Sequence, residues 1–241
     1  MNMFRTWFSL ISPRFLVITL FAQILLFNHV FAQDWPNLNR YAPDDKRLMN
    51  EPVQKDRVVF MGNSITDFWI RYSPEFFSAN HFVDRGISGQ TSPQMLIRFK
   101  QDVVDLKPAA VVIECGTNDI AGNTGPSTLK MIEDNISSMA EIAIAHKIKV
   151  VIGSVLPSNH FGWSPNVQPT ERIDSLNQWI RKYSKDNHLT YIDYYSSLVN
   201  EEMGMKREYS MDGVHPNKLG YTVMEKLAAE AIRKALKKRR Y

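Results

Sequence analysis

The stretch Val58–Thr66 reads VVFMGNSIT and decides the class of fold. Its first four residues form a compact apolar run, which is typical of a β-strand buried on both faces. Gly62 ends the run, and Ser64 follows at the start of a predicted helical turn. A serine in this position can project from the end of a strand, with backbone N–H groups of the turn around it. The alternative is a serine that only caps the helix, which is a frequent role for this residue.

Four other segments have the composition of strands. Those at 109–115 and 149–154 are also compact and rich in Val and Ile, whereas those at 81–87 and 189–193 are more polar. Compact apolar strands belong in the middle of a sheet that is buried on both faces, and either of the more polar segments is a candidate for an edge strand. Together with the strand at 57–61, the chain has five predicted strands.

The segments between these strands carry apolar residues three or four positions apart, as amphipathic helices do. The pattern occurs at 95–106, 129–142, 173–180 and 221–235. Strands that alternate with helices predict an α/β domain, with a mostly parallel sheet covered by helices on both faces. Right-handed crossovers then bring the carboxyl ends of the strands to one rim, where folds of this class bind ligands.

A second motif lies before the last predicted helix, where residues 212–216 read DGVHP. A neutral imidazole at His215 can accept the hydroxyl proton of Ser64 and return it to a leaving group. Asp212 can hold the other ring nitrogen, because two intervening residues fit a single turn. Asp-Gly alone is also a common surface turn. With Ser64, however, these residues supply a nucleophile, a base and an orienting carboxylate.

Two further loops on the same rim carry candidate hydrogen-bond donors. Gly89 follows the predicted strand 81–87 and offers a backbone N–H that a substrate can approach closely. Asn118 follows the strand 109–115 and offers a side-chain amide. With the N–H of Ser64 they predict an oxyanion hole, although each alone could be a residue of an ordinary loop.

Taken together, the motifs resemble those of the SGNH hydrolases, the GDSL esterase/lipase superfamily. The four residues that give the family its name correspond to Ser64, Gly89, Asn118 and His215, and Asp212 fits the Asp-x-x-His pattern of the family. The resemblance runs from about residue 57 to residue 235. It implies a flavodoxin-like three-layer α/β/α sandwich around a five-stranded sheet, and ester hydrolysis without a metal or another cofactor.

The first motif departs from the family pattern at two places. Asn63 stands where the pattern has Asp, and Ile65-Thr66 stands where leucine follows the serine. This variant resembles the acetylhydrolase-like and carbohydrate-esterase branches of the family. The position of Thr66 also excludes the Gly-x-Ser-x-Gly elbow of the α/β-hydrolases.

The first 32 residues have the layout of a secretory signal peptide. Arg5 and Arg14 precede the apolar run at 15–27, and Val30-Phe31-Ala32 offers a cleavage point. An uncleaved membrane anchor is the alternative, since the run is only slightly short for a span. We expect residues 33–56 to form a polar surface segment and residues 57–241 to form the hydrolase domain. The protein is then periplasmic or extracellular, without stable membrane insertion once the signal has been removed.

Charge and cysteine content limit the partners. Residues 33–241 contain 27 basic and 25 acidic residues, a net charge of +2, so nothing demands an acidic partner. The basic residues at 233–240 fit the end of a helix better than a nucleic-acid site, because no aromatic residues alternate with them. Cys115 is the single cysteine, which excludes an internal disulfide, and it reads as a buried apolar residue. The six histidines are dispersed, which argues against a metal-dependent phosphoesterase.

The sequence predicts the substrate less precisely than the fold or the catalytic residues. The loop 158–169 contains His160, Phe161 and Trp163, which could form an aromatic wall for a sugar or could pack the loop down. Export and the family resemblance favour removal of acetyl or other short acyl groups from carbohydrates. A lysophospholipase or thioesterase acting on longer chains is the runner-up, and a non-catalytic carbohydrate-binding protein is a minor alternative. The sequence leaves the oligomeric state open.

Overall fold

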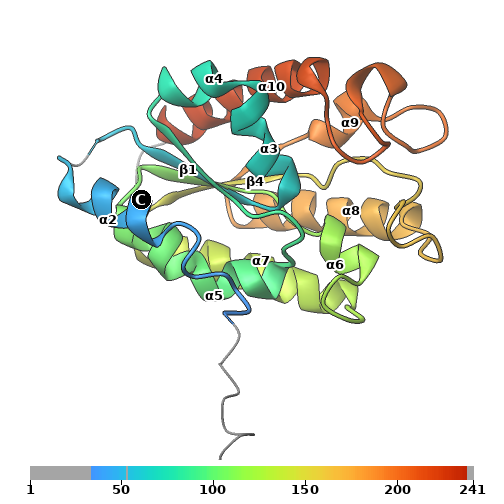
Figure 1. The fold of residues 1–241 in the computed structure, drawn as a ribbon, viewed down its shortest axis with the longest axis horizontal. Coiled ribbons are helices and arrows are strands. Elements are labelled where there is room, and N and C mark those ends of the chain that lie inside the picture. The colour runs from blue at the N-terminus through green and yellow to red at the C-terminus, as the bar shows by residue number, and fades with distance from the viewer. Residues whose placement is uncertain (1–33, 53, 238–241) are drawn as a thin grey trace, which may run out of the picture. The chain divides into compact units, whose positions relative to one another are not determined.

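In the computed structural model, which describes residues 34–52 and 54–237, five parallel strands form one sheet in the order β2-β1-β3-β4-β5 (Figure 1). The most apolar strands, β1, β3 and β4, occupy the middle of this sheet. The two more polar strands, β2 and β5, lie at its edges, which confirms both as edge strands. The strands are β1 Val58–Gly62, β2 Phe82–Gly86, β3 Ala110–Ile113, β4 Lys149–Gly153 and β5 Thr190–Ile192.

Helices cover both faces of the sheet, so the predicted three-layer α/β/α architecture is confirmed (Figure 1). One layer contains α3 Ser64–Tyr72, α4 Pro74–Ser78, α9 Tyr194–Leu198 and α10 Lys218–Lys237. The other layer contains α5 Ser92–Asp102, the 3-10 turn η1 Val104–Leu106, α7 Leu129–Ala145 and α8 Thr170–Asp186. The short helices α6 Thr117–Ala121 and η2 Arg207–Tyr209 complete this list, together with α2 Ala42–Asn50, which is described below.

Alternate residues of each central strand serve opposite layers of the core. In β1, Val59 and Met61 pack toward α5 and α7, whereas Val58 and Phe60 pack toward α3 and α10. All five residues of β1 are buried, which explains why this strand is a continuous apolar run. Cys115, just beyond β3, is 2% exposed, as expected for a small apolar residue. Burial, reinforced by the nearby charges of Asp119 and Glu114, raises the pKa of its thiol.

An aromatic cluster fixes helix α3 on the sheet. The ring of Trp69 meets those of Phe60 and Tyr221 at centroid distances of 5.5 and 5.6 Å. Phe77 of α4 packs edge-on against Phe60 at 5.3 Å. Contacts of this kind add about 0.5–1.5 kcal/mol each to the area that the rings bury. The first turn of α3, which begins at Ser64, is thereby held at the end of β1.

Two glycines let α3 approach the strand ends. A Cβ atom on Gly86 would lie 2.1 Å from the backbone nitrogen of Asp67, and one on Gly62 would lie 2.0 Å from Oγ1 of Thr66. Neither separation is sterically possible. The first turn of the helix therefore sits directly against the carboxyl ends of β1 and β2.

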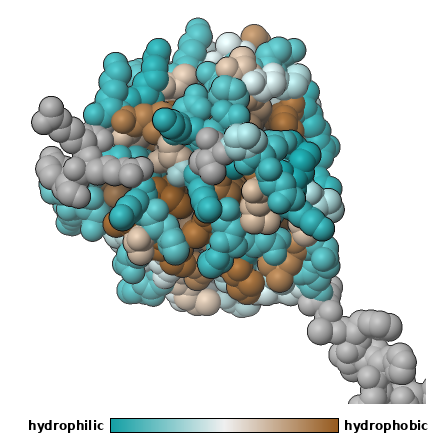
Figure 2. All heavy atoms as spheres, turned by 90° about the vertical axis from the view of Figure 1, so that its left-hand side faces the viewer, coloured by the Kyte–Doolittle hydropathy of each residue, from teal (hydrophilic) through white to brown (hydrophobic). Residues whose placement is uncertain are grey.

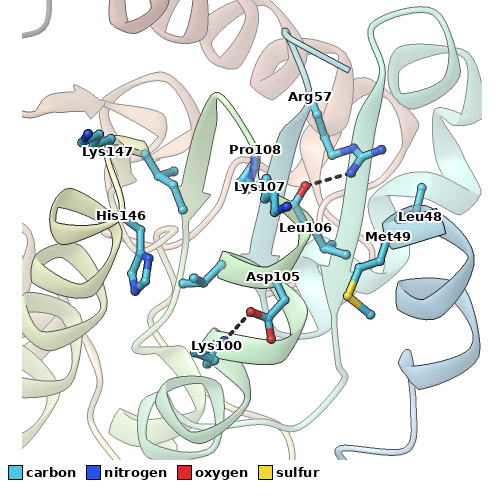
Figure 3. A pocket seen from close by; sticks show the side chains of 12 residues that line it. Leu48, Met49, Arg57, Lys100, Asp105, Leu106, Lys107, Pro108, His146 and Lys147 are labelled. Atoms are coloured by element: carbon cyan, nitrogen blue, oxygen red, sulfur yellow. Dashed lines mark hydrogen bonds and ion pairs between the residues drawn. The ribbon is translucent and has the colours of Figure 1, made fainter. Parts of the chain in front are cut away.

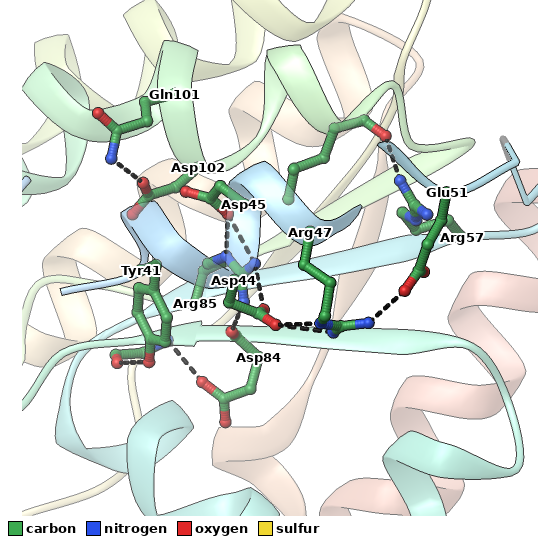
Figure 4. A network of polar contacts seen from close by, with 12 residues as sticks. Tyr41, Asp44, Asp45, Arg47, Glu51, Arg57, Asp84, Arg85, Gln101 and Asp102 are labelled. Carbon is green, nitrogen blue, oxygen red and sulfur yellow. Dashed lines mark hydrogen bonds and ion pairs between the residues drawn. The ribbon is translucent and has the colours of Figure 1, made fainter. Parts of the chain in front are cut away.

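Helix α2 lies in the segment that the sequence predicts as a polar surface segment (Figure 4). Its Asp45 is 1% exposed and accepts hydrogen bonds from Nε and Nη2 of Arg85, at 2.9 and 2.6 Å. Tyr41, just before the helix, donates its hydroxyl to the carbonyl of Gly86. A buried ion pair between α2 and the edge strand thus joins this segment to the domain. The predicted signal peptide, residues 1–32, lies outside the described residues.

The amino-terminal ends of the strands form a different surface. Figure 2 shows the side at the left of Figure 1, where hydrophilic side chains cover much of the face and hydrophobic atoms appear between them. Here a pocket of about 600 Å³ is bordered by Lys100, Lys107 and His146 (Figure 3). Its residues precede β1, β3 and β4, so it lies at the opposite end of the sheet from the motif loops. In the stretches the structure describes, no helix is both long and apolar enough to span a bilayer.

Candidate active site

Ser64 begins helix α3 at the carboxyl end of the central strand β1. The preceding Asn63 caps the helix, because its side-chain oxygen accepts the N–H of Ile65 at 2.9 Å. Ser64 therefore does not cap the helix, which was the alternative role for this serine. Its side chain is directed to the rim instead, although the residue as a whole is only 8% exposed.

A continuous hydrogen-bond chain joins the three predicted triad residues. Oγ of Ser64 lies 2.8 Å from Nε2 of His215, and Nδ1 of His215 lies 2.7 Å from Oδ2 of Asp212. The ionised carboxylate of Asp212 can only accept a hydrogen bond, so Nδ1 of His215 must carry the hydrogen. This tautomer leaves Nε2 free to accept the serine proton. The geometry is that of a nucleophile, a base and a group that orients the base.

The Asp212 carboxylate is held by the same turn that carries the histidine. Its Oδ1 accepts the backbone N–H groups of Val214 and His215, at 3.0 and 2.8 Å. Burial acts to raise the pKa of Asp212, but the hydrogen bonds from His215 and Val214 outweigh it and lower the pKa. Asp212 is consequently charged in the range in which it must stabilise an imidazolium.

Gly89 occupies a tight turn after β2. The N–H of Gln90 donates to the carbonyl of Ile87 at 3.2 Å, and Gly89 adopts a φ of +80°. A Cβ atom here would meet nothing within 4 Å, so the backbone conformation rather than lack of space calls for glycine. The residue is exposed on the rim, as an oxyanion donor must be.

Asn118, in the short helix α6, is 4% exposed and tied to the same turn. Its Nδ2 donates to the carbonyl of Gln90 at 2.9 Å, which leaves the second amide hydrogen for another acceptor. The next residue, Asp119, accepts the backbone and hydroxyl hydrogens of Ser92 at 2.6 to 3.0 Å. The two predicted oxyanion loops are thus fastened to each other and to the start of α5.

Asn123 is a residue of the site that the sequence did not single out. Its Nδ2 donates to the carbonyl of Gly89 at 3.2 Å, and its Oδ1 accepts the indole N–H of Trp163 at 2.9 Å. Its backbone N–H donates to the carbonyl of Asn118 at 3.0 Å. Asn123 therefore connects the loops of Gly89 and Asn118 with that of Trp163. In the sequence it is one more asparagine beside a glycine, a pattern that indicates only a turn.

The three residues predicted to bind substrate have different positions. Trp163 is 46% exposed, and its ring centre lies 6.3 Å from that of His215. Phe161 is fully buried and stacks against Trp163 at 5.1 Å, so of the two alternatives it packs the loop down and does not line the substrate wall. His160 is exposed and lies against Gly213, beside the turn of the triad.

From the sequence alone, Phe68 and Trp69 just after the nucleophile are both expected in the core, but Phe68 lies elsewhere. It is half-buried, and its ring centre lies 5.3 Å from that of His215. Its neighbour Trp69 is buried, as expected. One turn of α3 beyond Ser64 is enough to carry residue 68 to the rim, so helical periodicity from Ser64 was the signal that could have identified it.

Comparison with known proteins agrees with this arrangement. A crystal structure of a candidate acylhydrolase from Bacteroides fragilis is 45% identical, with a TM-score of 0.83 over 85% of this chain and 100% of its own. A GDSL-like lipase from Bacteroides thetaiotaomicron is 46% identical, with a TM-score of 0.81 over 83% of this chain and 98% of its own. Esterase TesA from Pseudomonas aeruginosa is 31% identical over 135 residues, or 56% of this chain, and the chain spans about 60% of the length of that relative.

The sequence also matches the GDSL-like lipase/acylhydrolase family over residues 60–223. This match begins in β1, just before Ser64, and ends in α10, beyond His215. Because it includes all the motif loops of the rim, the chain belongs to the GDSL-like lipase/acylhydrolase family.

Proposed function

We propose that the protein is a serine esterase that hydrolyses carboxylic esters through an acyl-enzyme. The hydrogen-bond chain from Ser64 through His215 to Asp212, with links of 2.8 and 2.7 Å, carries this proposal. A serine hydroxyl is a weak nucleophile by itself and needs an adjacent base that is held in the correct tautomer. Membership of an acylhydrolase family supports the same chemistry.

The reaction has two matched halves. Nε2 of His215 takes the proton of Ser64 as Oγ attacks the ester carbonyl carbon. The negative oxygen of the tetrahedral intermediate accepts hydrogen bonds from the N–H groups of Ser64 and Gly89 and from the amide of Asn118. The imidazolium then protonates the leaving alcohol, and the acyl group remains on Ser64. A water molecule, activated by His215, releases the acid and restores the serine.

The preferred substrates are acetyl or other short acyl esters of carbohydrates. Support comes from Trp163, an exposed aromatic ring beside His215, because such rings offer a flat apolar face to a sugar. Phe68 forms a second aromatic surface on the same histidine. We also propose that the domain acts outside the cytoplasm, as the signal-like sequence at residues 1–32 suggests.

The test compares the protein with its Ser64→Ala variant on p-nitrophenyl acetate, butyrate and octanoate and on acetylated xylan. Ser137→Ala is the matched control, because this half-buried serine lies on α7 and its hydroxyl only donates to the carbonyl of Asp134 in the same helix. Acetate release from the glycan that depends on Ser64 supports the carbohydrate esterase. A preference for octanoate with an inert glycan would replace it with an enzyme for longer acyl chains. Equal activity of the protein and of Ser64→Ala would contradict the esterase mechanism itself.

A further inference from the structure

Two arginines meet at Asp67, one helical turn after the proposed nucleophile, and have no part in the chemistry described above. Nη2 of Arg71 lies 3.3 Å from Oδ1 of Asp67, and Nη2 of Arg40 lies 3.6 Å from the same oxygen. Because both cations approach one atom, the two guanidinium groups are neighbours. Their side chains are 60% and 48% exposed, so both remain accessible to a ligand from solvent.

The shared carboxylate places this pair at the edge of the site. Asp67 lies one helical turn after Ser64 on α3, and its Oδ2 accepts the hydroxyl of Ser88 at 2.6 Å. Ser88 directly precedes Gly89, the proposed oxyanion donor. Asp67 thus fixes the two arginines against the loop that faces the reacting carbonyl.

A second line of contacts leads from Arg71 to the base. Its guanidinium lies over the ring of Phe68, 5.1 Å from the centroid, and that ring lies 5.3 Å from the ring of His215. In ester hydrolysis the leaving oxygen must come within hydrogen-bond reach of the general acid, which is the histidine here. The surface made by Phe68 and Arg71 is therefore next to the alcohol part of the ester rather than the acyl part.

The charge around the pair remains positive. Asp67 can neutralise one of the two cations. The other acids that border the same cavity are Asp44, Glu51 and Asp84, and the first two pair with Arg47 (Figure 4). Burial raises the pKa of Asp84 to about 7, despite the hydrogen bond from the N–H of Gly86, so it is only partly charged at neutral pH. Arg40, Asp67 and Arg71 also border one cavity of about 690 Å³, between α2, α3 and the edge strand β2.

The geometry points to Arg40 and Arg71 as a subsite for a carboxylate carried by the alcohol part of the ester, so that the substrate class is an acylated acidic sugar such as a uronic acid. Two guanidinium groups side by side can bind one carboxylate through several hydrogen bonds between opposite charges, whereas a neutral sugar offers them no anion. This inference deepens the proposed esterase function and rests on it.

A pair of small esters isolates the charge. The acetyl esters meta-acetoxybenzoate and meta-acetoxybenzamide have similar leaving groups, but only the first carries a carboxylate. The ratio of their kcat/KM values measures the preference for the anion. We expect the unmodified protein to favour the benzoate by about tenfold or more at low salt, and added NaCl to weaken the preference because both arginines are exposed.

Arg71→Gln and Arg40→Gln should each lower this ratio several-fold, chiefly through KM for the benzoate, and the double variant should abolish the preference. Arg181→Gln is a close control: Arg181 is also 60% exposed, pairs with one aspartate and lies over one aromatic ring, but it belongs to α8 beside the opposite edge strand β5. It should leave the ratio unchanged.

The outcomes separate the two proposals. Ser64-dependent hydrolysis of both esters with a ratio near one, or a ratio that survives in the double variant, would overturn the carboxylate subsite and leave the esterase standing. Hydrolysis that persists in Ser64→Ala would overturn the esterase mechanism and the subsite with it. With the subsite supported, acetylated polygalacturonate should release acetate faster than acetylated glucomannan, and the double variant should abolish that difference.

Discussion

At the scale of single residues, Asn118 tests the proposed oxyanion hole most cleanly. Its amide is already oriented by the hydrogen bond to the carbonyl of Gln90, so it needs no rearrangement to meet a developing charge. Asn118→Ala should lower kcat by about 100-fold or more with little change in KM, because the lost interaction belongs to the transition state. Steady-state kinetics on p-nitrophenyl acetate measures this. A rise in KM with an unchanged kcat would contradict the assigned role.

Glu114 is a second residue with an unusual setting. It is 4% exposed, and neither of its carboxylate oxygens has a hydrogen-bond partner among the residues that the structure describes. Burial, with a smaller effect from the charge of Asp119, raises the pKa of Glu114 from 4.5 to about 8. The folded protein therefore holds a proton that the unfolded chain releases near pH 4.5.

This proton gives the stability of the protein a definite pH dependence. The contribution of Glu114 is fully present below pH 4.5 and is lost as the pH rises toward 8, by at most about 1.4 kcal/mol per pH unit. Glu114→Gln, which cannot ionise, should remove this decline in the free energy of unfolding, whereas the exposed Glu141→Gln should not. Urea denaturation at about pH 5 and about pH 9 compares them. Parallel declines in all three proteins would exclude a buried, protonated Glu114.

At the scale of secondary-structure elements, the contact between α3 and the end of β2 determines where the nucleophile stands. Gly86→Ala would drive a methyl group into the backbone of Asp67, so α3 must shift or β2 must yield. We expect a loss of about 1–3 kcal/mol of stability together with reduced activity. Gly162→Ala is the control, because a Cβ atom there meets nothing within 4 Å. Thermal unfolding measures both, and equal melting temperatures would refute the close approach.

The elements also explain what could be predicted from the sequence. The strands and their parallel arrangement follow from short-range patterns, and parallel strands end on one rim, which places the loops of Ser64, Gly89 and Asn118. The meeting of Ser64 with Asp212 and His215 was predicted instead from the chemistry of a triad and from the family resemblance. The orientation of an aromatic ring within a loop does not follow from such patterns. Phe161 and Trp163 are two residues apart, yet one is buried and the other is exposed, and only the packing of the whole loop decides between them.

At the scale of the whole molecule, the segment before the first strand is part of the domain, although its polar composition does not predict this. Asp45 and Arg85 are 40 residues apart in sequence, and their contact replaces the solvent that each charge would otherwise need. Sequence patterns identify apolar faces well, but they do not show which two of many charged residues will pair in the interior.

Removing one member of this pair should therefore be costly. Asp45→Ala leaves the Arg85 guanidinium, which is 2% exposed, beside a single remaining partner on α2, the half-exposed Asp44. We expect the free energy of unfolding to fall by about 3–5 kcal/mol, whereas Lys46→Ala, on the exposed side of the same helix, should change it little. Chemical denaturation tests this. Equal stability of the two variants would mean that the buried Asp45–Arg85 ion pair contributes little to the stability of the fold.

The central claim is that Ser64 is the nucleophile and that His215 activates it. The most direct measurement is mass spectrometry of the protein after reaction with a fluorophosphonate, which labels activated serines covalently. The account predicts one adduct per chain, on the peptide that contains Ser64, and its loss in His215→Ala with the fold retained. An adduct on another serine, or labelling of Ser64 that does not depend on His215, would contradict it.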